Sequence, residues 1–172
     1  VLAYTQAVRM ALCGLNKQEI MISISSHIHH KELIKAYKQA CLNEFRDVTN
    51  MRGYIVHGFY CAFWALFNFE DYRSAIDAVI SLSPEEKVPA KFCSPGKQKN
   101  VICGDTDTNA AIAGALLGAY YGFSKMREDE TTNTNIDVLL TCDPNTGDIP
   151  RPARYLLNED NLIEMLKIAE KV

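Results

Sequence analysis

The chain has 172 residues, of which 48% are hydrophobic and 23% are charged, and its formal net charge is −3. These values are typical of one soluble globular domain with a single hydrophobic core, and the acidic balance excludes the basic surface of most nucleic-acid-binding domains. No apolar run is long enough to span a membrane, so we expect a single domain over residues 1–172 that binds neither nucleic acid nor a membrane.

Helical periodicity dominates the first part of the chain. Residues 30–49 are predicted to form a long amphipathic helix, because apolar side chains recur there at steps of three and four residues. These side chains are Ile34, Tyr37, Cys41, Phe45 and Val48. Residues 54–67 are apolar on nearly every side, which is typical of a helix buried at the centre of a domain.

The rest of the chain alternates predicted helices with predicted loops. A helix is expected after Asn68, which would be its N-cap. Its inner face would carry Tyr72, Ala75, Ile76 and Val79. Residues 83–100 and 125–152 are predicted to be long loops, although 136–140 are compatible with a short strand. A last helix is predicted from Asn158, because acids occupy its first turn and lysines its last. The sequence therefore predicts an all-α fold.

The chain has six cysteines: Cys13, Cys41, Cys61, Cys93, Cys103 and Cys142. None forms the C-x-x-C pair that zinc ribbons use. Several lie within apolar stretches, where a free thiol behaves as a small hydrophobic side chain. We therefore expect an intracellular, cytoplasmic protein in a reducing compartment.

Two carboxylates and a hydroxyl lie within four residues, just where a loop runs into a helix of small residues. They belong to Asp105, Asp107 and Thr108 (the 105–108 cluster). Oxygen donors crowded in this way suit a hard divalent cation such as Mg²⁺. Because Asp and Thr are also favoured N-caps, the alternative is that the cluster only caps the helix. A resemblance to the nucleophile loop of haloacid dehalogenase phosphatases is superficial, since Thr108 lies one residue too early.

Small residues follow the cluster at every fourth position: Ala110, Gly114, Gly118 and Gly122. Glycine inside a helix costs about 1 kcal/mol relative to alanine, so the repeated glycines indicate that a neighbouring element packs closely. A tightly packed helix would hold the carboxylates in fixed positions, as a metal site requires. Plain helix packing is the alternative explanation of this stripe.

The cluster and its helix, GDTDTNAAIAGALLGAYYG over residues 104–122, closely resemble the C-terminal signature of the ADP-ribosylglycohydrolases. That family includes the dinitrogenase-reductase-activating glycohydrolase and a crystallin. Residues 53–67 resemble the family's buried helix, and residues 69–76 resemble the helix that follows it. Residues 25–29, with His27, look like its Thr-His segment, and residues 6–9 faintly echo the end of its glycine-rich substrate loop.

The resemblance implies a compact orthogonal helical bundle and a metal-dependent hydrolase. The bond cleaved would be the glycosidic bond between ADP-ribose and a modified protein side chain or a related acceptor. Asp105, Asp107 and Thr108 would bind Mg²⁺ or Mn²⁺, two ions in the complete protein, and His27 would lie close to the ADP-ribose. The partner would be an ADP-ribosylated protein or a small molecule of the ADP-ribose type.

Part of the family's site has no counterpart in this chain. The family's other metal ligands, in a Thr/Ser-Asp-Asp motif, and its acidic catalytic residue lie near its N-terminus, and no such motif precedes residue 105. Tyr4, Thr5 and Gln6 also replace glycines whose backbone N–H groups would approach a diphosphate. We expect an N-terminal portion of the same fold to complete the site. The alternative is a catalytically incomplete member that acts as a binding or structural protein, like the crystallin.

The histidines also have explanations that involve no metal. His29 and His30, with His27, are expected to be surface histidines, because no cysteine or acid stands near them at ligand spacing. His57 lies on the predicted buried helix and is predicted to be a hydrogen-bonded structural histidine.

Overall fold

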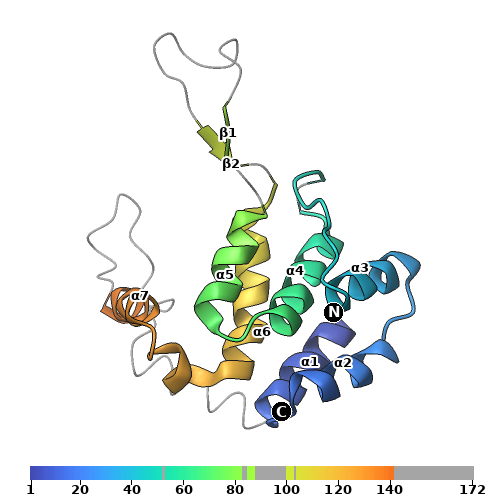
Figure 1. Ribbon diagram of the computed structural model, residues 1–172, viewed down its shortest axis with the longest axis horizontal. Coiled ribbons are helices and arrows are strands. Elements are labelled where there is room, and N and C mark those ends of the chain that lie inside the picture. Colours follow the sequence, from blue (N-terminus) through green and yellow to red (C-terminus); the bar gives the residue numbers. More distant parts are fainter. Residues whose placement is uncertain (52, 83–84, 88–99, 103, 142–172) are drawn as a thin grey trace. The chain divides into compact units, whose positions relative to one another are not determined.

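The computed structural model describes residues 1–51, 53–82, 85–87, 100–102 and 104–141. Within them it contains seven helices and two short strands (Figure 1), which confirms the predicted all-α fold class. The chain divides into two compact units, Val1–Phe123 and Ser124–Val172, and each is described by itself. The single domain expected over residues 1–172 stays a prediction.

The first two helices are joined by a turn whose residues end one helix and begin the next. α1 (Leu2–Leu12) is followed by Gly14 at φ +80°, the left-handed conformation that commonly ends a helix. α2 (Lys17–Ser25) begins with a capping box, in which the side chains of Asn16 and Glu19 each accept a hydrogen bond from the other's backbone N–H.

The helix predicted over 30–49 is shorter in the structure, where α3 covers Lys31–Cys41. Asn43 lies in the left-handed region at φ +55°, and the N–H of Glu44 donates to the carbonyl of Gln39 at 2.8 Å. These two features form a Schellman motif, which ends the helix. The prediction was wrong past this point because the apolar period continues in the sequence after the chain has turned.

α4 (Ile55–Asn68) is the central helix of the first unit, which confirms the buried helix predicted over 54–67. It contacts α2, α3 and α5 (Tyr72–Ser81). On α3, Tyr37 packs edge-on against Phe63 of α4 with 5.1 Å between the ring centroids, a favourable aromatic geometry. Six residues of α4 are fully buried: Tyr60, Cys61, Ala62, Phe63, Ala65 and Leu66.

The N-cap of α5 is an aspartate and not the predicted Asn68. Asp71 Oδ1 accepts a hydrogen bond from the N–H of Ser74 at 2.8 Å. Asn68 is the last residue of α4, and its Nδ2 donates to the carbonyls of Ala40 and Trp64, each at 2.8 Å. The prediction was wrong because the partner on α3 comes within reach of Asn68 only through packing.

Two short strands lie at the ends of the predicted loop over 83–100. β1 (Glu85–Lys87) and β2 (Asn100–Ile102) pair antiparallel, and residues 88–99 lie outside the described residues. The paired positions are Glu85 with Ile102, Glu86 with Val101 and Lys87 with Asn100. β2 ends just before the 105–108 cluster, so this pairing leads the chain to the candidate site.

α6 (Thr106–Met126) meets α4 and α5 through side chains. A Cβ on Gly58 of α4 would lie 2.7 Å from a side-chain methyl of α6, and a Cβ on Gly114 would lie 3.2 Å from the hydroxyl of Tyr72. Small residues therefore bring these helices together. The predicted stripe does not extend to Gly122, because this residue has φ +76° and ψ 159° and interrupts the helix.

The second unit contains α7 (Glu130–Thr141), within the predicted loop over 125–152. The loop prediction is wrong for these residues, as is the strand considered for 136–140. Asp129 caps the helix, since its Oδ1 accepts from the backbone N–H three residues further on at 2.7 Å. The helix was missed because a mostly polar segment carries little hydrophobic periodicity. The helix predicted from Asn158 lies outside the described residues.

None of the helices in the described part of the chain combines the length and the apolarity that crossing a membrane requires. Three of the cysteines there, Cys13, Cys41 and Cys61, are free thiols. Cys61 is buried in α4, and burial raises its pKa to about 12. The cytoplasmic location stays a prediction.

Candidate functional site

The 105–108 cluster lies at the start of α6. In Figure 1, α6 and α4 begin on the same side of the first unit. Asp105 is half-buried, whereas Asp107 and Thr108 are exposed on the first turn. The structure therefore brings the predicted oxygen donors together at one helix end. The partial positive charge of a helix N-terminus favours carboxylates at this position.

The carboxylate of Asp105 is held by a contact across the fold. Its Oδ2 accepts a hydrogen bond from the backbone N–H of Gly53 at 3.0 Å, although the two residues are 52 positions apart in the sequence. Its backbone carbonyl accepts from the N–H of Asn109 at 2.9 Å and so opens α6. Asp105 thus occupies the N-cap position, but its side chain connects α6 to the segment before α4. Capping alone does not account for this residue.

The segment before α4, residues 47–51 and 53 (the approach segment), has hydrogen bonds of its own. The carboxylate of Asp47 accepts from the hydroxyl of Thr49 at 2.7 Å and from its N–H at 2.9 Å, and these bonds lower the pKa of Asp47. Met51 and Gly53 have φ values of +50° and +74°. For a residue such as Met51 this conformation costs about 1 kcal/mol, so surrounding contacts must impose it.

His57 connects the approach segment to α4. Its Nε2 lies 3.0 Å from the carbonyl oxygen of Asn50 and 3.1 Å from Asn50 Oδ1. Because both neighbours are acceptors, Nε2 carries the proton and donates to them. The residue is 5% exposed, and burial, followed by the charge of Arg46, lowers its pKa. These contacts confirm the predicted hydrogen-bonded structural histidine.

Polar groups also lie on the inner side of the start of α6. Asn109 is 4% exposed and faces α4, where a Cβ on Gly58 would lie 3.5 Å from its Oδ1. Its Nδ2 and the hydroxyl of Thr106 are buried without a hydrogen-bond partner among the described residues, as is Nδ1 of His57. The start of α6 therefore has a polar inner edge in addition to its outer carboxylates.

The cluster offers a hard cation donors of the right chemistry, two anionic and one neutral. Mg²⁺ takes about six ligands in an octahedron, so these side chains fill part of the shell, and water, substrate hydroxyls or further side chains fill the rest. Within the described ranges, no three His, Cys, Asp or Glu side chains gather as a metal-binding group. The assignment of Asp105, Asp107 and Thr108 as metal ligands stays a prediction.

His27 lies in the turn that follows α2, and its imidazole has local contacts. Its Nδ1 lies 2.9 Å from the carbonyl oxygen of Ser23 and 3.2 Å from Oγ of Ser26. The side chain is half-buried, whereas His29 and His30 are exposed. The hydrogen bonds of the described residues do not link His27 to the 105–108 cluster, so its place near ADP-ribose stays a prediction.

The residues that stand in place of the substrate-loop glycines lie inside α1. Tyr4, Thr5 and Gln6 are helical, and the N–H of Thr5 donates to the carbonyl of Val1 at 3.0 Å. The hydroxyl of Tyr4 donates to the carbonyl of Ile112 at 2.8 Å and so joins α1 to α6. These residues help to pack the bundle, and their helical backbone differs from an open glycine loop that surrounds a diphosphate.

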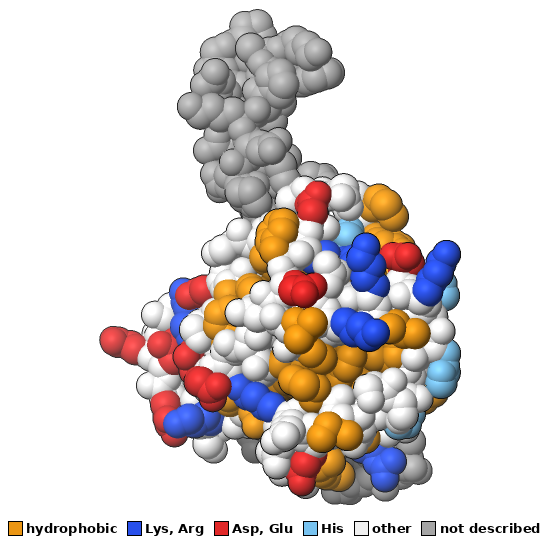
Figure 2. All heavy atoms as spheres, turned by 45° about the vertical axis from the view of Figure 1, so that its right-hand side comes forward, with side chains coloured by type: hydrophobic (Ala, Val, Ile, Leu, Met, Phe, Trp, Pro, Cys, Tyr) orange, Lys and Arg blue, Asp and Glu red, His pale blue; other side chains and the backbone are white. Residues whose placement is uncertain are grey.

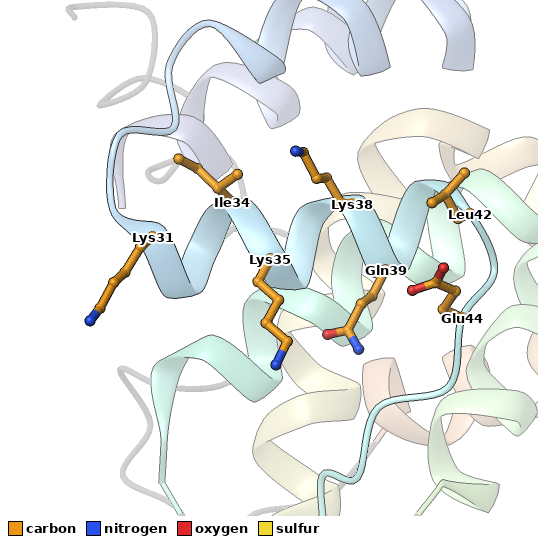
Figure 3. A pocket seen from close by; sticks show the side chains of 7 residues that line it. All are labelled: Lys31, Ile34, Lys35, Lys38, Gln39, Leu42 and Glu44. Carbon is orange, nitrogen blue, oxygen red and sulfur yellow. The ribbon is translucent and has the colours of Figure 1, made fainter.

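A groove and a pocket lie on the first unit. The groove, of about 470 Å³, follows α3, and in Figure 3 Lys35 and Gln39 extend on one side of this helix. It is lined by Lys31, Ile34, Lys35, Lys38, Gln39, Leu42 and Glu44. Figure 2 shows apolar side chains exposed among lysine or arginine side chains on the face it presents.

The pocket, of about 220 Å³, is apolar and is lined by Val1, Tyr4, Leu33, Ile55, Phe59 and Ile112.

A family model described as ADP-ribosylglycohydrolase matches residues 1–141, from the start of α1 to the end of α7. The chain belongs to the ADP-ribosylglycohydrolase family. This confirms the resemblance predicted from residues 104–122. The match also includes the approach segment and His57, so both are parts of an ADP-ribosylglycohydrolase domain. No curated protein and no solved structure matches the chain significantly.

The approach segment of this family member is the part of the candidate site that sequence reasoning missed. Its contact with Asp105 has no local signal, because Gly53 and Asp105 are far apart in the chain. A weaker signal exists at Asp47, since the Asp-x-Thr spacing is typical of an Asx turn. That signal indicates a turn before α4, but it does not indicate which helix end the turn contacts.

Proposed function

We propose that this chain is a metal-dependent hydrolase that cleaves the glycosidic bond between ADP-ribose and a modified protein side chain or a related acceptor. The observation that carries the proposal is the placement of the 105–108 cluster on the partly exposed start of α6, in a chain whose family match spans residues 1–141. Its partner is then an ADP-ribosylated protein or a small molecule of the ADP-ribose type.

Each residue of the cluster has a separate task in this proposal. Asp105 and Asp107 hold Mg²⁺ or Mn²⁺, and the hydroxyl of Thr108 is a neutral third donor. The N–H of Gly53 donates to Oδ2 of Asp105 at 3.0 Å, and Oδ1 would be the oxygen that binds the cation. When bound, the cation lowers the pKa of a water molecule and orients the ribose hydroxyls.

The helices hold these donors in a fixed place. Gly58 lets α4 approach α6, and Gly114 lets α5 approach it. The Tyr4 hydroxyl donates to the carbonyl of Ile112 at 2.8 Å, so α1 also holds α6. A helix start restrained on three sides changes little when a ligand binds, which favours both affinity and orientation.

Release of ADP-ribose tests the proposed reaction. We expect the chain to release free ADP-ribose, measured by chromatography, from ADP-ribosylated arginine or serine peptides in the presence of Mg²⁺ or Mn²⁺. Asp107→Ala removes a metal ligand and is expected to lower the rate on the order of 100-fold. Asp77→Ala is the matched control, because Asp77 is an exposed carboxylate on α5 that pairs with Arg73 at 2.7 Å.

Metal titration tests the site without the reaction. Calorimetric titration of Mn²⁺ is expected to give a binding isotherm for the unmodified chain and for Asp77→Ala, and a much weaker one for Asp107→Ala. Equal binding by the unmodified chain and Asp107→Ala would assign the cluster a capping role only. The prediction that an N-terminal portion of the same fold completes the site is tested by adding such a portion to the same assays.

A non-catalytic binding or structural role is the second candidate function. The observation that favours it is the helical backbone of Tyr4, Thr5 and Gln6, which differs from a loop that could surround a diphosphate. In that case ADP-ribose would bind weakly or not at all, and no peptide would lose its modification even when an N-terminal portion of the same fold is added. Release of ADP-ribose under either condition contradicts this second role.

A further inference from the structure

Two sets of hydrogen bonds hold the approach segment, one from α4 and one from a carboxylate of the proposed metal site. His57 Nε2 lies 3.0 Å and 3.1 Å from the two oxygens of Asn50, and the side-chain amide of Asn50 donates to Asp47 Oδ2 at 3.0 Å. The approach segment then ends at Gly53, whose N–H donates to Asp105 Oδ2 at 3.0 Å. A backbone hydrogen bond also closes the turn that contains Gly53, since the N–H of Tyr54 donates to the carbonyl of Met51 at 3.0 Å.

The chemistry of His57 indicates that its task lies at Nε2. Its Nδ1 is buried without a partner among the described residues, which is unfavourable for a nitrogen acceptor. An apolar ring such as phenylalanine would fill the same space without this unpaired atom. The residue type is therefore explained by the hydrogen bonds to Asn50 and not by filling of the core.

The conformation of the approach segment requires such a restraint. Met51 at φ +50° and Gly53 at φ +74° are both in the left-handed region, and Met51 persists there only because its surroundings impose it. Among the described residues, the segment forms hydrogen bonds with His57 on one side and with Asp105 on the other, in addition to the bond from the N–H of Tyr54. Without the first contact, the N–H of Gly53 would lose its fixed direction.

We propose that His57 is a positioning residue, which orients the Asp105 carboxylate through Asn50 and the N–H of Gly53. This inference rests on the proposed function for its purpose, but the positioning itself does not depend on a bound metal. His57 touches neither the cluster nor any substrate in this account, and it acts only through the approach segment.

Amide hydrogen exchange of the metal-free chain, measured by NMR at Gly53, tests the positioning directly. We expect the Gly53 amide to be protected in the unmodified chain and to exchange about tenfold or more faster in His57→Phe and in Asp105→Ala. His57→Gln is expected to restore protection, because its side-chain N–H can replace that of Nε2. A rescue of this kind would not follow from a packing role.

Two further variants make the result decisive. Tyr37→Phe removes a partly buried hydrogen bond from the Tyr37 hydroxyl to the carbonyl of Met21 and is expected to leave the exchange of the Gly53 amide unchanged. Asn50→Ala alters an exposed side chain and is expected to accelerate exchange at Gly53 even if His57→Phe does not fold. Unchanged Gly53 exchange in the folded His57→Phe, or in Asn50→Ala, overturns the proposal. So does equal loss of protection in His57→Phe and His57→Gln.

The Mn²⁺ affinity of the same variants separates this inference from the proposed function. We expect His57→Phe to bind Mn²⁺ about tenfold more weakly than the unmodified chain, because replacing a residue that supports a metal ligand commonly lowers the affinity by at least this much. His57→Gln is expected to bind Mn²⁺ normally. If Asp107→Ala binds Mn²⁺ as well as the unmodified chain, the proposed function fails while the Gly53 exchange still decides the positioning. If only Asp107→Ala loses affinity, the metal site stands and the role of His57 in it is refuted.

Discussion

At the scale of single residues, Asp105 has one role through its backbone and another through its carboxylate. Its backbone begins α6, and its Oδ2 accepts from Gly53 at 3.0 Å. A side chain that only capped α6 would accept from the N–H groups of its own first turn. The contact with the approach segment therefore orients the second oxygen, and the charge on that oxygen is what a cation requires.

Replacing Asp105 with asparagine separates these two uses. Asp105→Asn keeps an oxygen for the N–H of Gly53 and remains a good N-cap, so we expect the free energy of unfolding to change by less than about 0.5 kcal/mol. The lost charge is expected to weaken Mn²⁺ binding by about tenfold or more. Urea unfolding and calorimetry check the two effects. A large loss of stability with unchanged Mn²⁺ affinity would contradict this division.

At the scale of secondary-structure elements, the ends of the helices depend on single residues and their contacts on small ones. Asn43 ends α3 in the left-handed conformation, and Asp71 begins α5. Where α4 meets α6, Gly58 faces the end of the Ile112 side chain: a Cβ there would lie 2.7 Å from Cδ1 of Ile112, which would have to move. The distance between α4 and the part of α6 that follows the cluster thus depends on a glycine in α4.

Enlarging Gly58 is expected to separate α4 from α6. Gly58→Val places further methyl groups against Ile112 and Asn109, and we expect a loss of about 1–3 kcal/mol in the free energy of unfolding, as in other overpacked cores. The double variant Gly58→Val with Ile112→Ala returns some of the space and should recover part of the loss. Urea unfolding gives both values. An unchanged midpoint for Gly58→Val would show that the contact is easily relieved.

At the scale of the whole molecule, the buried imidazole of His57 makes stability depend on pH. Burial, followed by the charge of Arg46, lowers the pKa of His57 below its ordinary 6.5, whereas the hydrogen bond to Asn50 and then the charge of Asp47 act in the opposite direction. The unfolded chain therefore binds a proton at a higher pH than the folded chain does. By linkage, this contribution to stability is complete above about pH 6.5 and is lost as the pH falls through the lowered pKa.

Thermal or urea unfolding between pH 7.5 and pH 5 checks this prediction. The unmodified chain is expected to lose stability as the pH falls over this range. His57→Gln has no titratable group at position 57, so its stability should fall less steeply over the same range, whatever its value at pH 7.5. Parallel curves for the two proteins would show that other groups control the pH dependence.

The amino-acid sequence by itself determined the all-α class, the buried helix over 54–67, the family and the existence of the 105–108 cluster. These depend on local periodicity and on residue types that stand close together in the chain. Only the tertiary structure decided that Asn68 faces α3, that Gly58 sets the contact between α4 and α6, and that Gly53 holds Asp105 across 52 positions. The physical reason is that such contacts arise when helices pack, and packing brings together residues that no local pattern connects.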